Sequence, residues 1–278
     1  MSGAPWPRAW LFTPADEPHK LNSATRSGAE GLIADLEDGV APQRKYLARE
    51  HAAEFLARAN GEGPRRIVRI NDPRTERGRH DLERLAGQPG LTVMVPKASL
   101  SSVDLVHEAG AQAIALVESV IGVSEVERIA TLEGVVAIAI GTVDLAAELG
   151  LGELPGGMEL LHIRSRVVLA CALAGVPAID GVHLRTGDLE ELGVEARRSR
   201  ALGFAAKLCI HPAQLAVVRE AFAPSAQELE HARAVVDAYE RALADARGAV
   251  LNNGELGDLS TVRRARLILG DASRSSTE

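Results

Sequence analysis

The chain has 278 residues and a formal net charge of −7, with 46% hydrophobic and 25% charged residues. These values are typical of a soluble globular protein with one large α/β domain or two small ones. An acidic chain without a basic face is a poor nucleic-acid binder. No apolar run approaches the ~20 residues that span a bilayer, and the N-terminus lacks the pattern of a signal peptide. Cys171 and Cys209 form no CxxC pair, so we expect a cytoplasmic protein in a reducing compartment, with no nucleic-acid or membrane partner.

Short apolar, β-branched runs alternate with longer stretches of helical periodicity. The runs predict eight strands, at Ala9–Thr13, Gly31–Asp35, Arg66–Ile70, Leu91–Val95, Ala113–Val117, Val135–Ile140, Ala178–Val182 and Ala206–Ile210. The stretches between them predict amphipathic helices, for example Gln43–Ala59, Leu160–Ala174 and Leu189–Leu202. Eight such units predict an α/β fold of the (β/α)₈ TIM-barrel type over residues 1–223. An open doubly wound sheet is the alternative, although no GxGxxG follows the first strand.

The C-terminal part of the chain, residues 224–278, is predicted as a helix followed by a lid segment. Pro224–Arg247 has helical periodicity, Asn252-Asn253-Gly254 is a turn signal, and a short helical stretch follows the turn. The chain then ends in polar Ser and Thr residues, which we expect to be disordered.

Polar side chains follow nearly every predicted strand, at the end where a barrel of this type carries its active site. They are Asp16 in the stretch Thr13-Pro14-Ala15-Asp16 at the first strand, Glu37 and Asp38 after the second, Arg69 and Asn71 at the third, Lys97 after the fourth, Glu118 after the fifth, Asp144 after the sixth, and His211 after the eighth. Unrelated loops would not be expected to concentrate carboxylates, Arg, Lys and His in this way.

Glu118 and Asp144 form the best candidate metal pair, because they follow adjacent strands and their carboxylates can converge. Two protein carboxylates, completed by water and substrate oxygens, are a common Mg²⁺ arrangement. The alternative is that Glu118 forms an ion pair with an arginine and Asp144 caps the next helix.

Three other positions have two interpretations each. Arg69 has a guanidinium suited to a substrate carboxylate or a developing enolate oxygen, or it forms an ion pair with Glu37 or Asp38. Glu37 and Asp38 orient metal-bound water or other ligands, or they supply negative charge to the start of a helix. His211 is a base or a structural hydrogen-bonding residue.

An ordered series of motifs resembles the citrate lyase β-subunit-like members of the HpcH/HpaI aldolase superfamily. The resemblance runs from about residue 8 to about residue 268. It is carried by Trp10–Asp16, Asp35–Pro42 with Lys45 and Arg49, Arg69–Asn71, Val95–Lys97, Glu118–Gly122, Gly141–Leu145 and Lys207–Gln214. The whole series is much more specific to the family than any one motif.

The resemblance implies a (β/α)₈ barrel, Mg²⁺ with Mn²⁺ as an alternative ion, and lyase chemistry on 3-hydroxyacyl-CoA thioesters such as malyl-CoA or citramalyl-CoA. It places Mg²⁺ on Glu118 and Asp144 and the oxo-acid part of the substrate on Arg69. It further implies a homotrimer or hexamer in which a C-terminal segment supplies Asp258 to a neighbouring subunit's site. The remaining substrate contacts that we expect are with Pro14, Lys20, Lys97, Ile210 and His211.

The C-terminal segment departs from the family pattern. Leu256-Gly257 stand in place of Met-Val, and Ser260 stands where a proline is expected. Several functions remain open beside the lyase, which would release an oxo acid and acetyl-CoA. They are a thioesterase on the same substrates, the β chain of a complex acting on citryl groups of a carrier protein, and a non-catalytic metabolite-binding barrel.

Overall fold

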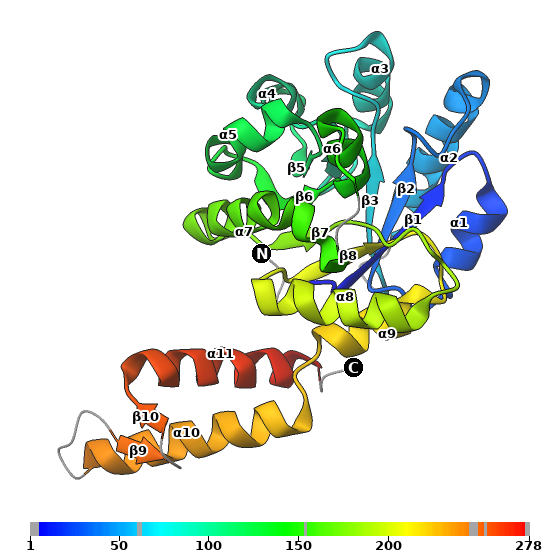
Figure 1. The fold of residues 1–278 in the computed structure, drawn as a ribbon. Coiled ribbons are helices and arrows are strands. Elements are labelled where there is room, and N and C mark those ends of the chain that lie inside the picture. The colour runs from blue at the N-terminus through cyan, green and yellow to red at the C-terminus, as the bar shows by residue number, and fades with distance from the viewer. Residues whose placement is uncertain (1–5, 60–62, 153–154, 245–249, 253–254, 276–278) are drawn as a thin grey trace. The chain divides into compact units, whose positions relative to one another are not determined.

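A computed structural model describes residues 6–59, 63–152, 155–244, 250–252 and 255–275. Eight parallel strands close into a barrel in the chain order β1 to β8, and the intervening helices lie around its outside (Figure 1). The predicted TIM-barrel fold is therefore confirmed. None of the helices in the described part of the chain combines the length and the apolar composition needed to traverse a bilayer.

The barrel strands agree with the predicted runs to within two residues at each end. They are β1 (Ala9–Pro14), β2 (Gly31–Asp35), β3 (Arg65–Arg69), β4 (Thr92–Val95), β5 (Gln112–Val117), β6 (Val135–Ile140), β7 (Ala178–Asp180) and β8 (Ala206–Cys209). Strand residues are buried on both faces because one face fills the barrel and the other packs under the helices. The side chains of β2 and β4 are accordingly all buried.

Nine helices in the described part of the chain surround the barrel, and several of them begin or end at residues with capping chemistry. They are α1 (Pro18–Ala24), α2 (Lys45–Ala57), α3 (Glu76–Leu85), α4 (Leu100–Glu108), α5 (Val120–Ala130), α6 (Thr142–Leu149), α7 (Leu161–Ala174), α8 (Leu189–Leu202) and α9 (Gln214–Phe222), with 3₁₀ turns at Pro42–Arg44 and Pro155–Leu160. Ser119 and Asp188 accept hydrogen bonds from backbone N–H groups at the starts of α5 and α8. Left-handed Gly175 and Gly203 end α7 and α8.

One close contact inside the barrel wall depends on a missing side chain. Trp10 on β1 is fully buried and lies beside Gly31, its partner residue on β2. A Cβ at Gly31 would stand 2.4 Å from the indole ring, so a larger residue here would displace either Trp10 or the strand. The close approach of Trp10 therefore requires glycine at this position of β2.

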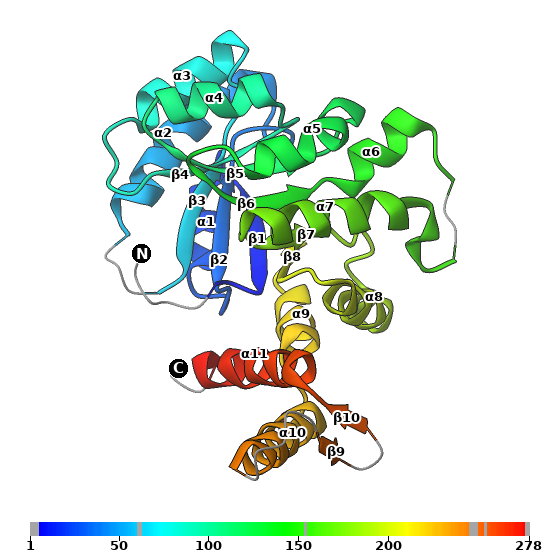
Figure 2. The same cartoon turned by 90° about the vertical axis from the view of Figure 1, so that its left-hand side faces the viewer.

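The chain divides into two compact units, Pro7–Arg219 and a unit that contains Trp6 and the residues from Glu220 onward. In the second unit, α10 (Ala226–Ala244) and α11 (Leu259–Ser275) pack side by side through a cluster that includes Val235, Tyr239 and Val262 (Figure 2). Between them, β9 (Val250–Asn252) and β10 (Glu255–Gly257) form an antiparallel pair. The sequence indicated the turn and a short helix here, but α11 has 17 residues and the two strands were not predicted. Residues 276–278, where disorder was expected, lie outside the described residues.

Candidate active site at the carboxyl ends of the strands

The predicted site residues from β2 to β6 lie on one rim of the barrel, because all eight strands are parallel. Arg69 is the last residue of β3, Glu118 directly follows β5, and Lys97 lies two residues beyond β4. Glu37 lies two residues beyond β2, and Asp144 is in the first turn of α6. The barrel thus brings together side chains that are more than 100 positions apart in the chain.

Arg69 is held in place by two carboxylates and an aromatic ring. Its Nε and Nη2 donate hydrogen bonds of 2.7 Å each to the two carboxylate oxygens of Asp35. Its Nη1 lies 3.0 Å from Glu37 Oε2, an ion pair without hydrogen-bond geometry. The guanidinium carbon also lies 4.7 Å from the centre of the Phe12 ring. The structure therefore contains the predicted pairing of Arg69 with Glu37 and adds a fork-shaped contact with Asp35.

In the sequence, Asp35 stands out only as part of a motif. In the fold, it is the main partner of Arg69. Burial opposes ionisation of this carboxyl, but the hydrogen bonds and charge of Arg69 outweigh burial and lower the pKa of Asp35. Asp35 also accepts hydrogen bonds from the backbone N–H groups of Glu37 and Gly39. It is thus an ionised group that orients both Arg69 and the loop after β2.

Glu118 is the most deeply buried of the predicted metal ligands, with 4% of its surface exposed. Burial, together with the charges of the neighbouring Glu37 and Asp144 carboxylates, raises the pKa of Glu118 to about 8. Burial likewise raises the pKa of Glu37 to about 7. No ion pair within 4.0 Å joins Glu118 to any arginine of the described residues, so the alternative interpretation of Glu118 as an ion-pair partner of arginine is not seen there.

Two backbone features aim the Glu118 carboxylate. Lys97 has a φ of 45°, the left-handed region, and is alone in this among the non-glycine residues of the described ranges. This conformation points the Lys97 N–H at Glu118 Oε1, 2.8 Å away. On the other side, a Cβ at Gly141 would lie 2.4 Å from Glu118 Cβ. Strain at a strand end and a required glycine are common at functional sites.

Asp144 lies next to this carboxylate cluster without serving as the helix cap. The N-cap position of α6 is Gly141, and Asp144 is three residues further on, partly buried in the first turn. Its charge is one of the causes that raise the pKa of Glu118. Both side chains carry carboxylate oxygens, the donor type that divalent cations such as Mg²⁺ prefer.

The remaining predicted residues lie at the rim or away from it. Pro14 is the last residue of β1, and Ile210 and His211 directly follow β8 with exposed side chains. Lys20 is on α1, where its Nζ lies 2.8 Å from Glu17. Asp38 is exposed beside Glu37, whose pKa it raises.

Asp258 belongs to the second unit, where its carboxylate has a structural partner. It precedes α11 and accepts hydrogen bonds of 2.9 Å from the N–H groups of Ser260 and Thr261. The hydrogen bond from the Thr261 N–H is the main reason why the pKa of Asp258 is lowered. Asp258 is thus an ionised N-cap within its own chain.

A second cluster of charges lies between the barrel wall and the helices α7 and α8. Lys207 on β8 is fully buried, and its Nζ lies 2.8 Å from Asp180 on β7 and 2.7 Å from Glu195 on α8. Arg164 on α7 donates to the same Asp180 oxygen at 2.9 Å. A lysine inside an otherwise apolar predicted strand was the available sequence signal. Since its partners come from the surrounding helices, this cluster joins the helices to the barrel.

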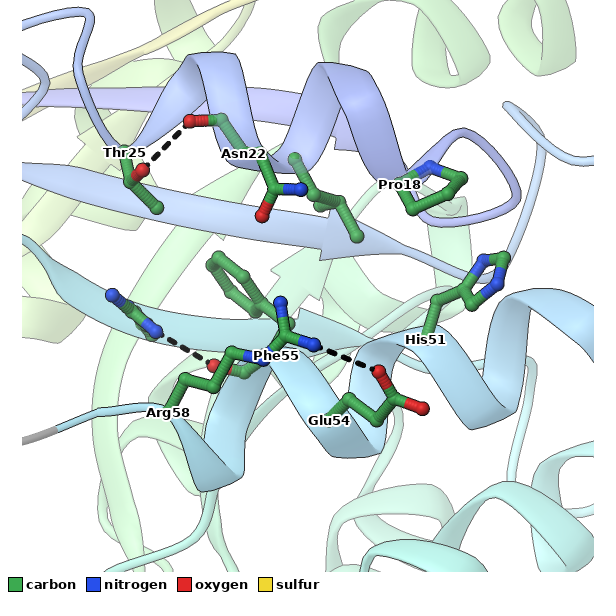
Figure 3. A pocket seen from close by; sticks show the side chains of 9 residues that line it. Pro18, Asn22, Thr25, His51, Glu54, Phe55 and Arg58 are labelled. Atoms are coloured by element: carbon green, nitrogen blue, oxygen red, sulfur yellow. Dashed lines mark hydrogen bonds and ion pairs between the residues drawn. The ribbon is translucent and has the colours of Figure 1, made fainter.

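A separate cavity of about 290 Å³ lies between α1 and α2 (Figure 3). Phe55 and Leu21 supply apolar lining, and Arg58 and Arg66 contribute positive charge. Arg58 is paired with Glu54, and Arg66 donates to the carbonyl of Phe55. None of the predicted site residues lines this cavity, so it is distinct from the carboxylate cluster.

Comparison with known proteins identifies the family. A protein-family model described as HpcH/HpaI aldolase/citrate lyase matches residues 8–212 of the chain. The chain belongs to this family. The HpcH/HpaI match covers all eight barrel strands and therefore every predicted site residue except Asp258. The resemblance seen in the sequence motifs is thereby confirmed.

Individual members of the HpcH/HpaI family are similar over almost the whole chain. A citrate lyase subunit beta-like protein of Mycobacterium tuberculosis is 37% identical over 274 residues, 97% of each chain. A (3S)-malyl-CoA thioesterase of Cereibacter sphaeroides is 32% identical over 270 residues, 95% of this chain and 94% of that protein. The crystal structure of CitE from M. tuberculosis with magnesium, acetoacetate and coenzyme A has a TM-score of 0.86 at 37% identity, covering 98% of this chain and 100% of that one.

Proposed function

We propose that this protein is a Mg²⁺-dependent carbon–carbon lyase that cleaves or forms a 3-hydroxyacyl-CoA, such as malyl-CoA or citramalyl-CoA. The products of cleavage are acetyl-CoA and a 2-oxo acid. The observation that carries the proposal is the buried Glu118 carboxylate, which lies among like charges at the active-site rim of the barrel. The magnesium and coenzyme A in the similar CitE structure support the same chemistry.

Glu118 and Asp144 would hold the metal, with Mg²⁺ as the first choice and Mn²⁺ as an alternative. When bound there, the ion would lower the pKa of the substrate hydroxyl and polarise the keto group that emerges from it. The Lys97 N–H and the bare Gly141 backbone keep the Glu118 carboxylate in one orientation. Glu37, whose pKa is raised to about 7, and Asp38 would hold water or other ligands at the same site.

Arg69 would bind the carboxylate of the oxo-acid part. Asp35 engages its Nε and Nη2, so the guanidinium is fixed before substrate arrives. Nη1 makes no hydrogen bond with Glu37, and its N–H groups remain as donors for a substrate oxygen. A planar cation held in this way also offsets charge that develops as the bond breaks.

In the cleavage direction the hydroxyl would give its proton to a carboxylate of the site, a role we assign to Glu37. The O–H electron pair then forms the keto group, the Cα–Cβ bond breaks to release the oxo acid, and the electron pair of that bond forms the thioester enolate. We assign proton exchange with the acetyl methyl carbon to Asp258 of a neighbouring subunit in a homotrimer or hexamer: the ionised carboxylate would take the proton in condensation, and its protonated form would return it to the enolate in cleavage. Contacts with the rest of the thioester are assigned to Pro14, Lys20, Lys97, Ile210 and His211. Lys97 forms no Schiff base in this mechanism.

The products of the isolated protein distinguish this function from its alternatives. The test incubates the protein with Mg²⁺ and malyl-CoA or citramalyl-CoA and resolves the products by mass spectrometry. Acetyl-CoA with an oxo acid supports the lyase. Hydroxy acid with free CoA would instead make it a thioesterase, the name given to the Cereibacter relative. Turnover only of a carrier-protein substrate would indicate a complex subunit, and binding without turnover a metabolite-binding barrel.

A further inference from the structure

The cavity between α1 and α2 has an apolar wall and a positively charged end (Figure 3). Its volume of about 290 Å³ is enough for a small organic molecule. Leu21 and Phe55 in its lining are both buried, so they offer apolar surface to a ligand and little to bulk water. Figure 3 shows Thr25 and Arg58 toward one end of the lining and His51 toward the other.

Phe55 holds the guanidinium of Arg66 in the wall of this cavity. Nη1 of Arg66 donates a 2.8 Å hydrogen bond to the Phe55 carbonyl, and the guanidinium carbon lies 5.0 Å from the centre of the Phe55 ring. Nε and Nη2 of Arg66 donate to no group of the described residues. They form the same edge of the guanidinium with which Arg69 binds Asp35. Arg66 thus keeps a forked pair of donors for a carboxylate.

The charge around Arg66 also favours an anion. The pKa of Arg66 is lowered by burial and, to a smaller extent, by the charge of Arg58. No carboxylate within the described ranges lies within 4.0 Å of the Arg66 guanidinium. Glu54 pairs with Arg58 at 3.1 Å, but both side chains are mostly exposed, and such a pair offsets little charge. A bound anion would stabilise the half-buried cation.

This cavity and the reaction centre use opposite ends and opposite faces of β3. Arg66 is the second residue of the strand and Arg69 is the last, so they lie about 10 Å apart along it. Because side chains alternate between the faces of a strand, residues three apart point to opposite sides. At the other end of the cavity, His51 Nδ1 lies 3.0 Å from the carbonyl of Ala15, in the loop after β1. The positive end is therefore remote from the rim.

We propose that the cavity between α1 and α2 is a second binding site, which takes a small organic carboxylate with an apolar body. The free edge of Arg66 would bind the carboxylate side-on, and Arg58 would add positive charge. The apolar body would cover Leu21 and Phe55. A bare inorganic anion would leave that apolar wall uncovered, so the ligand needs both parts. The proposal is independent of the lyase function.

The test measures the binding of benzoate by titration calorimetry, because benzoate joins a carboxylate to an apolar ring. Benzyl alcohol supplies the ring without the charge, and acetate supplies the charge without the ring. Arg66→Gln removes the charge while glutamine can still donate to the Phe55 carbonyl, and Arg58→Gln changes an exposed side chain. The matched control is Arg77→Gln, exposed on α3 and outside the cavity lining. Each titration is repeated with pyruvate and Mg²⁺ in excess, and thermal melts verify folding.

We expect benzoate to bind one-to-one with a dissociation constant of about 1 mM or lower, whether or not pyruvate is present. Arg66→Gln should raise this constant about tenfold or more and Arg58→Gln about two- to fivefold, because hydrogen bonds to charged groups are stronger than neutral ones. Benzyl alcohol and acetate should bind at least about tenfold more weakly than benzoate. Arg77→Gln should match the wild type.

The absence of saturable benzoate binding at about 10 mM would overturn the inference. Equal affinity for benzoate and benzyl alcohol would do so as well, and so would wild-type affinity in folded Arg66→Gln. If Arg66→Gln does not fold, wild-type affinity in Arg58→Gln decides against the site in the same way. Loss of benzoate binding when pyruvate is in excess would place the probe at the reaction centre and would also overturn the inference.

Discussion

Replacing Glu118 by Gln should stabilise the metal-free protein at alkaline pH while abolishing its activity. The folded state binds the Glu118 proton more tightly than the unfolded chain does, because burial raises the pKa of Glu118 to about 8. Stability is therefore lost as pH rises from about 4.5 to about 8 and the buried carboxylate ionises. Glutamine has nearly the same shape, still accepts from the Lys97 N–H, and carries no charge.

The magnitude follows from the pKa of Glu118. Because a shift of one pKa unit is worth about 1.4 kcal/mol, a rise in the pKa of Glu118 from 4.5 to about 8 lowers the free energy of unfolding at high pH by at most ~5 kcal/mol. Relief of even ~1 kcal/mol would raise the melting temperature by roughly 2–4 °C in a chain of this size. At pH 4.5 the two proteins should melt at similar temperatures, since Glu118 is then protonated.

The assay is a thermal melt at pH 4.5 and 8.5, with EDTA or with Mg²⁺. Mg²⁺ at about 100 times its dissociation constant should stabilise the wild type by ~2.7 kcal/mol and leave Glu118→Gln unchanged, so the stability difference between the two proteins should shift by about that amount in favour of the wild type. Asp35→Asn is the matched control, and its effect on stability should have the opposite sign. Arg69 lowers the pKa of Asp35, so removal of the ionised Asp35 carboxylate should destabilise the protein at neutral pH. A Glu118→Gln protein that melts below the wild type at pH 8.5 in EDTA would refute the reasoning.

Three further substitutions test other parts of the structure. Lys207→Met leaves a buried carboxylate without its ammonium partner and should cost roughly 3–5 kcal/mol in urea unfolding; a loss below ~1 kcal/mol would contradict this. Gly141→Ala places a methyl group against Glu118 and should lower kcat/KM at least about tenfold by weakening Mg²⁺ binding, whereas Gly152→Ala, with open space around it, should be neutral in the same assay. Arg69→Lys should lose most activity because a point ammonium cannot replace a forked guanidinium, and unchanged kcat/KM would remove Arg69 from the site.

The barrel could be predicted from sequence because its signal is local. Each strand is a short run of buried aliphatic residues, and the alternation with helical segments repeats eight times. Strand ends were less certain: Val182 was predicted within the seventh strand, but β7 ends at Asp180. The Lys207 ammonium group donates hydrogen bonds to the Asp180 carboxylate and to the Gly181 carbonyl. No local sequence pattern reveals these contacts.

The site residues could be proposed from their positions after strands, but their partners could not. Asp35 and Arg69 are 34 residues apart, and only the parallel pairing of β2 with β3 sets them side by side. The left-handed backbone of Lys97 is another tertiary feature, since nothing in its residue type favours that conformation. Gln214 stands out in the sequence only as the end of a motif, and its hydrogen bonds to the loops after β7 and β8 appear only in the fold.

The second unit was the least predictable part of the chain. Asn253 and Gly254 of the predicted turn lie outside the described residues, and β9 and β10 pair as antiparallel strands on either side of them. A three-residue strand carries too little alternation to be detected by periodicity. The hydrogen bonds from Ser260 and Thr261 to Asp258 show how a residue expected in catalysis also has a local structural function.

The most direct test of the central claim is the position of a bound metal ion. Crystals grown with Mn²⁺ and pyruvate should show an anomalous difference peak in bonding contact with the carboxylates of Glu118 and Asp144. The pyruvate carboxylate should lie against the Arg69 guanidinium. A Mn²⁺ peak at any other place, or pyruvate bound at that rim with no metal beside Glu118, would contradict the account.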